Sequence, residues 1–334
     1  MGKADVNVNI WLSEKKRFAD LFNGVIYGGR QVILPEDLVE VNSVSSVSVK
    51  NRAGKTKNMK RYRDIIMKWR NQATLVLLAN ESQGKVHYAM PHKVMLYDGM
   101  DYETQIRNNW KNFNDRRKQN KKAGQPLEHL TAGEYLSRFR KKDRLIPIIS
   151  LVFYYGSEPW DGPVDLYDMF QLEGTKEEKE ILEKYLPNYK INLVDAERVE
   201  DVEKFSDDLQ VILTMLRYRD SKEELTDYIN ENKKFFQNVD YETSQAMKAF
   251  LNMKQIPGEA EHKEEMVDMC KAIQEMYDDG VKDGIRQGVE RGIAAVIRTC
   301  RNLNVSKEDT LNNIQREYEL SKEDAEKYLE TYWK

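Results

Sequence analysis

Apolar residues recur at helical spacing near the start of the chain and then in strand-like runs. Over residues 13–28 the spacing predicts a capped amphipathic helix that ends at Gly28 and Gly29. From Val41 onward valines alternate with polar residues, which is typical of an extended or strand-like stretch. The Gly- and Lys-rich residues 50–60 indicate a turn. The apolar face of the first helix would consist of Phe18, Leu21, Phe22, Val25 and Ile26.

Two apolar runs separated by a short polar turn predict neighbouring strands in RYRDIIMKWR (61–70) and ATLVLLANES (73–82). The second run is apolar throughout most of its length, which predicts a position in the sheet centre. Helical spacing follows over residues 87–113, with Pro91 in the first turn. Residues 114–144 form a basic excursion that contains a capped helix. Two later runs, RLIPIISLVFYYG and YKINLVDA, predict further strands.

From Val202 onward the pattern is helical, and residues 259–303 are compatible with one long helix. Glycines recur inside it every four residues, and each interior glycine costs roughly 1 kcal/mol relative to alanine. We therefore expect close approach of a second helix, supplied by protein because the intervening residues are charged. The expected apolar stripe is Met266, Met269, Ile273, Met276, Val281, Ile285, Val289, Ile293 and Ile297, beside Gly280, Gly284, Gly288 and Gly292.

Two repeats of SKED, at residues 306–309 and 321–324, have the spacing of capping boxes and predict two short terminal helices. The chain then divides into a first domain over 1–200, a helical extension over 201–258 and a C-terminal region over 259–334. We expect the C-terminal helices to pair two protomers into a homodimer.

The charge is unevenly distributed, although the net charge is only −3. Residues 1–150 hold 28 Lys and Arg against 15 Asp and Glu, or +13, and the remainder holds 25 against 41, or −16. This division suggests that the first half faces a polyanion, unless surface charges segregate here without a partner. No apolar run approaches the ~20 residues of a membrane span, and the first thirty residues lack signal-peptide features. With two cysteines far apart, we expect a cytoplasmic setting.

Acidic residues stand near the ends of the two predicted neighbouring strands. Hydrolysis of a phosphodiester by a divalent ion needs hard oxygen ligands on a rigid platform. Asp64 and Glu81 meet this description, with the Ser82 carbonyl as a third candidate ligand. Glu81 and Gln83 would project to the same face of a strand. His87 and His92 are poorly spaced for sharing a zinc ion on a helix.

Several strings resemble the recombination-promoting nuclease family, the YhgA-like transposases within the PD-(D/E)XK nuclease superfamily. They are FADLFNGVIYGGRQVILPEDL, RYRDIIM, NESQGKVHYAMPHKVMLYD, RLIPIISLVFYYGSEPWDGP and the glycine-spaced C-terminal helix. The resemblance runs from about residue 15 to near residue 196, and more loosely to the end. It implies an α/β fold, a restriction-endonuclease-like mixed sheet flanked by helices and followed by an all-α C-terminal region. It also implies DNA cleavage dependent on Mg²⁺ or Mn²⁺.

Carried over by position, the resemblance implies that Asp64 and Glu81 are the metal-binding carboxylates and that Asp20 is a candidate outer ligand. Gln83 stands where the superfamily has a lysine that orients water and steadies developing charge. Glutamine can orient water but supplies no positive charge. Lys93, near the start of the following helix, is the candidate for the missing cation, the alternative being that it points into solvent or contacts phosphate.

Three basic segments are candidates for salt-dependent contact with DNA phosphates, although lysine-rich loops are often only soluble surface. Trp110 and Phe113 beside them fit stacking on bases or, at helical spacing, a place in the core. The rival function is a nuclease-fold DNA-binding or assembly protein that does not cleave. The predicted DNA-binding residues are Lys60, Arg61, Arg63, Arg116, Arg117, Lys118, Arg140, Lys141 and Lys142.

Overall fold

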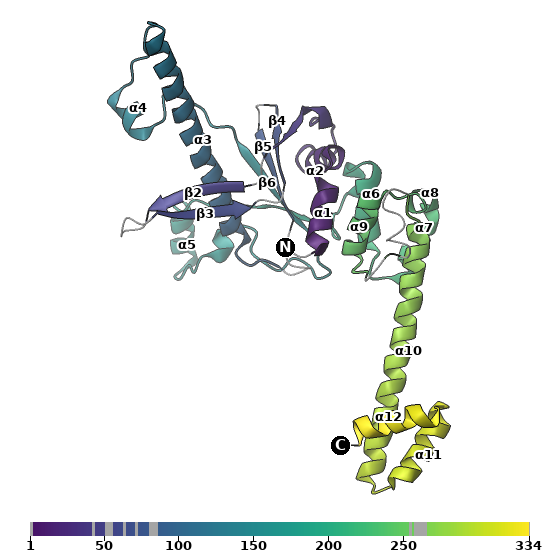
Figure 1. Ribbon diagram of the computed structural model, residues 1–334. Coiled ribbons are helices and arrows are strands. Elements are labelled where there is room, and N and C mark those ends of the chain that lie inside the picture. The colour runs from purple at the N-terminus through teal and green to yellow at the C-terminus, as the bar shows by residue number, and fades with distance from the viewer. Residues whose placement is uncertain are drawn as a thin grey trace. The chain divides into compact units, whose positions relative to one another are not determined.

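The computed structural model describes residues 3–41, 44–50, 56–62, 65–70, 73–79, 86–253, 256 and 266–333, with side chains described outside 3–5, 44–50, 56–62 and 77–79. The chain has an α/β fold: a mixed sheet with helices around it and a helical C-terminal region, as the sequence predicted (Figure 1). It divides into two compact units. The first comprises residues 1–233 with 239–267, and the second comprises residues 234–238 with 268–334.

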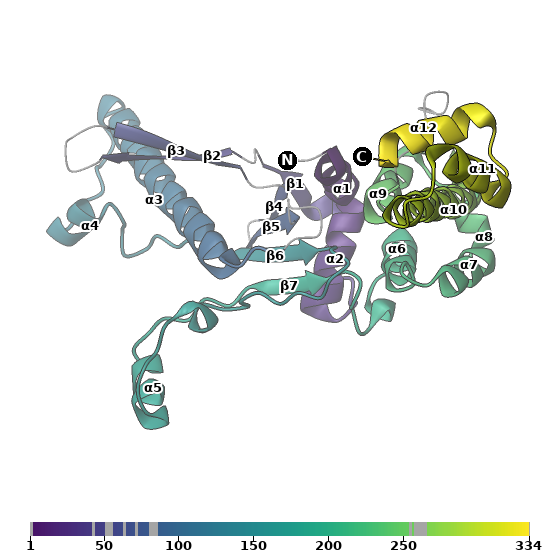
Figure 2. The ribbon, with the colours of Figure 1, turned by 90° about the horizontal axis from the view of Figure 1, so that it is seen from below.

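Within the described residues, the sheet of the first unit has five strands in the order β1-β4-β5-β6-β7. β4 runs antiparallel to β1 and β5, whereas β5, β6 and β7 are parallel neighbours (Figure 2). The run ATLVLLA lies in the centre, as predicted. A separate hairpin pairs β2 with β3. The bounds are β1 Leu38–Glu40, β2 Val44–Lys50, β3 Thr56–Tyr62, β4 Ile65–Trp69, β5 Ala73–Ala79, β6 Ile148–Tyr154 and β7 Asn192–Asp195.

The helix predicted over residues 13–28 is α2, and it ends at Gly28 in the left-handed conformation, with φ 61°. Glu14 caps its start by accepting from the backbone N–H groups of Lys16 and Arg17. Phe18, Leu21 and Phe22 are buried on its inner face, but Val25 and Ile26 are exposed, so the predicted face was too wide at its C-terminal end. A further helix, α1, precedes α2 and was not predicted.

The helix that follows β5 is α3, and Pro91 lies in its first turn as predicted. It continues into the predicted basic excursion as far as Lys122, because the arginines, lysines and glutamine there favour helix. α4 is the capped helix expected inside the excursion. The helices that begin in the first unit are α1 Lys3–Ser13, α2 Lys15–Tyr27, α3 Met90–Lys122, α4 Ala132–Ser137, α5 Lys176–Glu183, α6 Asp207–Arg217, α7 Lys222–Glu231, α8 Lys233–Phe236 and α9 Tyr241–Phe250.

Helices cover both faces of the sheet. On one face, Met90 and Val94 of α3 pack with Ile66, Val76 and Val152 from three adjacent strands. The opposite face is covered by α1 and α2, and α9 packs against α1. There the Tyr27 and Trp69 rings meet edge to face at 6.3 Å, and Trp11 meets Phe250 in the same way at 5.6 Å.

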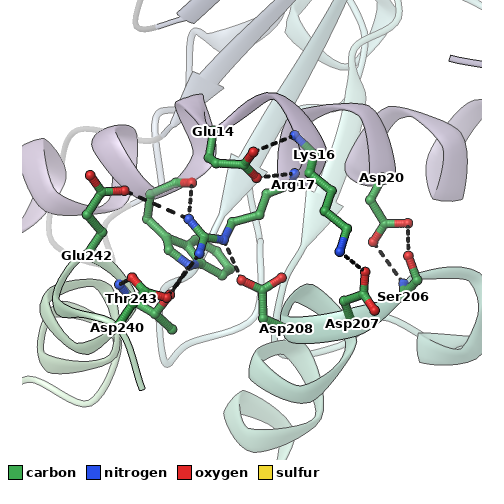
Figure 3. A network of polar contacts seen from close by, with 11 residues as sticks. Glu14, Lys16, Arg17, Asp20, Ser206, Asp207, Asp208, Asp240, Glu242 and Thr243 are labelled. Carbon is green, nitrogen blue, oxygen red and sulfur yellow. Dashed lines mark hydrogen bonds and ion pairs between the residues drawn. The ribbon is translucent and has the colours of Figure 1, made fainter. Parts of the chain in front are cut away.

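A polar network joins the two N-terminal helices to helices that follow the sheet in sequence (Figure 3). The guanidinium of Arg17 on α2 donates to Asp208 on α6 and to Thr243 Oγ1 of α9 at 3.0 Å. The Trp11 indole donates to the same hydroxyl at 3.1 Å, and the Arg17 guanidinium lies 5.4 Å from the centre of the Trp11 ring. Residues of the predicted helical extension therefore pack with the first helices inside one compact unit. The division of domains at residues 200 and 258 stays a prediction.

The second unit contains the long helix α10 Met269–Asn302 and the two terminal helices α11 Lys307–Tyr318 and α12 Lys322–Tyr332. Ser306 and Ser321 cap the terminal helices by accepting from the N–H groups of Asp309 and Asp324, as the SKED repeats predicted. The two terminal helices share a core with the end of α10, and this core contains Ile293, Ile297, Ile314 and Ala325.

The middle of α10 differs from the predicted continuous buried stripe. Val281, Ile285 and Val289 are 53%, 63% and 37% exposed. A Cβ added at Gly280, Gly284 or Gly288 would meet no described atom within 4 Å, whereas at Gly292 it would lie 2.6 Å from the Tyr318 hydroxyl. Close helix approach is thus present at Gly292, and the other three glycines face open space among the described residues.

Candidate functional site

The start of β4 and the end of β5 lie at one edge of the sheet. Ile65, the first residue of β4, pairs with Leu77, and Ala79, the last residue of β5, pairs with Phe153 of β6. The predicted metal and water-orienting residues border these strand ends in sequence. They lie outside the described residues: Asp64, Glu81, Ser82 and Gln83.

Side-chain alternation sets a condition on a shared ion. Ile66 faces α3, and two residues before it stands Asp64, which regular alternation would put on the same face. Leu75 pairs with Met67, on the other face, and regular alternation from Leu75 would carry Glu81 to that face. One ion bound by both acids therefore requires an irregular residue, such as a β-bulge, beside Asp64 or between Ala79 and Glu81.

Lys93 lies in the first turn of α3, the helix that covers the face of Ile66 and Val76. Its ammonium is 5.9 Å from the centre of the Tyr97 ring, one turn further along the same helix. The side chain is half-buried, and the neighbouring His92 is exposed. Lys93 is thus held against α3 on the face where regular alternation would place Asp64.

A buried carboxylate anchors α3 to the sheet. Asp98 is 3% exposed and accepts from the Ser150 hydroxyl of β6 at 2.8 Å and from the Tyr189 hydroxyl. The pairing fixes the rotation of α3 about its axis and therefore the direction in which Lys93 leaves the helix. No spacing in the sequence connects these three residues.

Asp20 is buried in α2 and has a capping role (Figure 3). Its carboxylate accepts from the backbone N–H of Ser206 at 2.8 Å and from the Ser206 hydroxyl at 2.7 Å. Ser206 is the N-cap residue of α6, so Asp20 supplies a negative charge at the N-terminus of that helix. Both of its oxygens are engaged, and the predicted role as an outer metal ligand stays a prediction.

A buried ion pair that the sequence reasoning missed lies just beyond β7. Glu197 is 9% exposed and pairs with the guanidinium of Arg219, whose Nη1 donates to the Tyr155 carbonyl at 3.0 Å. The Nη2 atom of Arg198 lies 3.5 Å from Oε1 of Glu197 and donates to the Ser157 carbonyl at 2.7 Å. Burial raises the pKa of Glu197, although Arg219 and Arg198 act in the opposite direction. These contacts close the sheet edge where β6 and β7 end.

The predicted basic excursion (residues 114–144) continues the cationic C-terminal half of α3, and together they form a segment, residues 107–144, that we call the basic arm. It holds 12 Lys and Arg against 4 Asp and Glu. Of the 12 cations only Arg140 is buried. Among the described residues, no carboxylate forms an ion pair with Arg116 or Arg117, and Lys118 pairs with Asp115 at 3.7 Å. The arm therefore presents a large positive surface.

Arg140 has a structural position that the predicted DNA-binding set did not anticipate. Its guanidinium pairs with Asp143 at 2.6 Å and with Glu128 at 3.3 Å, and it lies 4.5 Å from the centre of the Phe113 ring. Asp143 holds the pKa of Arg140 above its usual range. Arg140 organises the arm from inside, whereas Lys141 and Lys142 on its C-terminal side are exposed.

Of the remaining predicted phosphate contacts, two belong to the β2–β3 hairpin. Lys60 and Arg61 lie in β3, opposite Ser46 and Ser45, with their side chains outside the described residues. Arg63 lies outside the described residues altogether. Their contact with DNA stays a prediction.

In the part of the chain that the structure describes, no group of three or more His, Cys, Asp or Glu residues is arranged to hold a metal ion. The described helices include none with the length and apolar character of a membrane span.

Comparison with known families supports the resemblance seen in the sequence. No curated protein and no solved structure matches the chain significantly. A family model does match, over about a third of the chain. This segment begins within the basic arm, contains β6 and β7, and extends into α9. Residues 130–247 thus match the family described as "Putative transposase, YhgA-like".

Proposed function

We propose that this protein is a metal-dependent DNA endonuclease of the recombination-promoting type, which hydrolyses phosphodiester bonds. The observation that carries the proposal is the shared sheet edge at the start of β4 and the end of β5. Asp64 directly precedes Ile65, and Glu81 follows Ala79 by two residues. Chain geometry keeps the Glu81 Cα within about 7 Å of the Ala79 Cα. We therefore assign both acids to this edge of the sheet, on the condition given above that an irregular residue brings them to one face.

The proposed donor set fits Mg²⁺ or Mn²⁺. Asp64 and Glu81 would supply carboxylate oxygens and Ser82 a peptide carbonyl, and hard divalent cations prefer oxygen ligands of these kinds. Asp20 would act at most from outside this set, because its oxygens already bind Ser206. When bound, the ion supplies charge neutralisation at the scissile phosphate and lowers the pKa of water.

Gln83 and Lys93 divide the work of the lysine that the superfamily carries. The Gln83 amide would orient the attacking water through its carbonyl and N–H groups. Lys93 would place an ammonium beside the phosphate as negative charge develops there. Asp98 contributes by fixing α3, from which Lys93 projects.

The basic arm would bind the DNA backbone through Arg116, Arg117, Lys118, Lys141 and Lys142. Lys60 and Arg61 of the hairpin would add to these contacts, as would Arg63, which lies outside the described residues. Such contacts are salt-dependent and largely independent of sequence. Arg140 is left out of this set because its guanidinium is buried and paired. The proposed setting is the cytoplasm, where cysteines such as Cys270 and Cys300 remain reduced.

Supercoiled plasmid and Mg²⁺ or Mn²⁺ provide the test. We expect nicking or linearisation by the parent protein, loss of cleavage in Asp64→Ala and Glu81→Ala, and unchanged cleavage in Glu173→Ala, which removes an exposed acid near α5. Cleavage retained in both Asp64→Ala and Glu81→Ala would overturn the assignment of these two residues as metal ligands.

Glutamine at position 83 favours a second candidate, a nuclease-fold protein that binds or assembles on DNA without cutting it. The same experiment separates the two functions: plasmid binding by the parent protein without cleavage, at any Mg²⁺ or Mn²⁺ concentration, would establish the second. In either case we propose that α10 pairs two protomers, because Val281, Ile285 and Val289 are exposed beside glycines that leave room for another helix.

A further inference from the structure

The tip of the basic arm carries two large apolar side chains in solvent. Tyr135 and Leu136, both on the short helix α4, are 68% and 86% exposed. α4 lies beside the distal half of α3, away from the sheet (Figure 1). Two adjacent exposed apolar side chains surrounded by polar residues offer apolar area that a partner can bury, and burial of apolar area is a main source of binding energy.

The arm holds this tip in a fixed place. Tyr135 meets Trp110 of α3 edge to face at 6.1 Å, and Trp110 lies 5.6 Å from Phe113. At the start of α4, Thr131 and Glu134 form a reciprocal capping box. Glu134 also accepts from the Lys141 N–H at 3.0 Å, which ties α4 to the segment after it. Leu136 is therefore presented by a folded element and needs no ordering on binding.

The positive charge around the tip favours an anionic partner. Arg138 and Lys141, close to α4 in sequence, are exposed, and among the described residues no carboxylate forms an ion pair with either. The exposed apolar residues of α5 offer a contrast. Ile181 and Leu182 are 54% and 46% exposed, but α5 is rich in glutamate, which a polyanion would repel.

We propose that Leu136 is an apolar wedge that enters the minor groove of duplex DNA, flanked by Tyr135, while the cations of the basic arm hold the phosphates on both sides. Architectural DNA-binding proteins insert leucine between base steps in this way and kink the duplex. The inference rests on the proposed DNA-binding function and adds the element that bends the substrate.

The test measures binding of the full-length protein to a random-sequence DNA duplex of about 30 base pairs. EDTA removes divalent ions, so that binding is measured without cleavage. Leu136→Ala should weaken binding by about tenfold or more, as loss of one inserted side chain implies. The slope of log affinity against log salt should stay unchanged, because no phosphate contact is lost. Arg116→Ala should instead reduce that slope by about 1. In a duplex labelled with a fluorophore at each end, the end-to-end distance should shorten when the parent protein binds and bends the DNA. It should stay unchanged when Leu136→Ala binds.

Two further variants control for indirect effects. Leu136→Met keeps an apolar wedge and should retain bending, whereas Leu182→Ala removes a comparable exposed leucine from α5 and should change nothing. Equal affinity and bending in the parent and Leu136→Ala would overturn the wedge and leave the proposed function intact. A change in oligomeric mass with Leu136→Ala, at unchanged DNA affinity, would also overturn it by assigning the tip to a protein partner. Absence of DNA binding by the parent protein would defeat the proposed function itself.

Discussion

Arg17 of α2 pairs with Asp208 of α6 in the interior of the first unit. The preceding residues on the two helices, Lys16 and Asp207, form a second pair that is exposed to solvent. The side chains of the inner pair are 10% and 22% exposed, and those of the outer pair are 64% and 56% exposed. Asp207 raises the pKa of Lys16. The two pairs join the same helices in different surroundings, and they should differ strongly in their contribution to stability.

We expect Arg17→Ala to lower the free energy of unfolding by about 3 kcal/mol, because it leaves Asp208 without its partner and removes donors to Thr243. Lys16→Ala should cost about 1 kcal/mol or less, as exposed pairs do. Chemical denaturation of both variants measures the difference. Equal losses would mean that the inner pair is as well solvated as the outer one.

Gly24 and Gly99 test the packing of helices α2 and α3. A Cβ at Gly24 would lie 2.3 Å from the ring of Phe205, which is 5% exposed and cannot move without disturbing its neighbours. Gly24→Ala should therefore destabilise the protein by about 1–3 kcal/mol. A Cβ at Gly99 would meet no described atom within 4 Å, so Gly99→Ala should stabilise α3 by up to about 1 kcal/mol. Thermal unfolding distinguishes the two directions.

Glu134 should keep α4 capped in acid. Hydrogen bonds from the backbone N–H of Thr131, the N–H of Lys141 and the Thr131 hydroxyl lower its pKa from the ordinary 4.5 to about 2. Because the folded-state pKa is depressed, the stabilisation is present above pH 4.5 and is lost as the pH falls through about 2. An NMR titration of the Glu134 carboxyl carbon should have its midpoint near that lower value.

The matched variant for this titration is Thr131→Val, which removes the hydroxyl but keeps the backbone N–H. The midpoint of Glu134 should then rise towards 4.5 without reaching it. An ordinary midpoint in the parent protein would show that the capping box is open in solution.

Lys93 should contribute to cleavage by its charge. If its ammonium stabilises the transition state, Lys93→Ala should lower the plasmid cleavage rate by about 10²–10³-fold with little change in DNA affinity. Lys93→Arg should recover part of the rate, and His92→Ala, which changes the exposed neighbour, should leave the rate unaltered. An equal loss of DNA affinity in Lys93→Ala would assign Lys93 to phosphate binding.

Pairing through α10 predicts a charge-sensitive interface. Ile285→Glu places a carboxylate on the exposed glycine-spaced face, and we expect it to raise the dimer dissociation constant by about tenfold or more. Because Ile285 is 63% exposed, the unfolding temperature of the second unit should not change at high dilution. Ile181→Glu on α5 is the control. Sedimentation of all three proteins over a range of concentrations gives the comparison, and a monomeric parent protein would refute the pairing.

The sequence predicted the local structure well where the apolar period was clear. The central strand β5, the helix α2 with its glycine end, Pro91 in the first turn of α3 and both SKED helix starts are all present. It missed α1, whose apolar residues fit the core only when α9 is in place, because the contact of Trp11 with Phe250 spans most of the chain. Periodicity reports one element at a time and carries no information about such distant partners.

The candidate site was predictable to a lesser degree. Composition located the basic arm, but its exposed and buried cations could not be told apart, since Arg140 is enclosed only through Asp143, Glu128 and Phe113. Similarly, nothing adjacent to Asp20 in sequence indicates that Ser206 occupies its carboxylate. The predicted acids at positions 64 and 81 rest on motif spacing and on the order of the strands.

The packing of α1 against α9 determines when the N-terminal helices can complete their contacts during synthesis. Trp11 and Arg17 bind Thr243, a residue made more than 220 positions later, so the first two helices wait for most of the polypeptide before they are fully enclosed. Until α9 has been synthesised, the Trp11 side chain lacks its contacts with Phe250 and Thr243, so α1 would present an exposed indole to chaperones. Nascent chains released before α9 should be insoluble even though every strand of the sheet has already been synthesised.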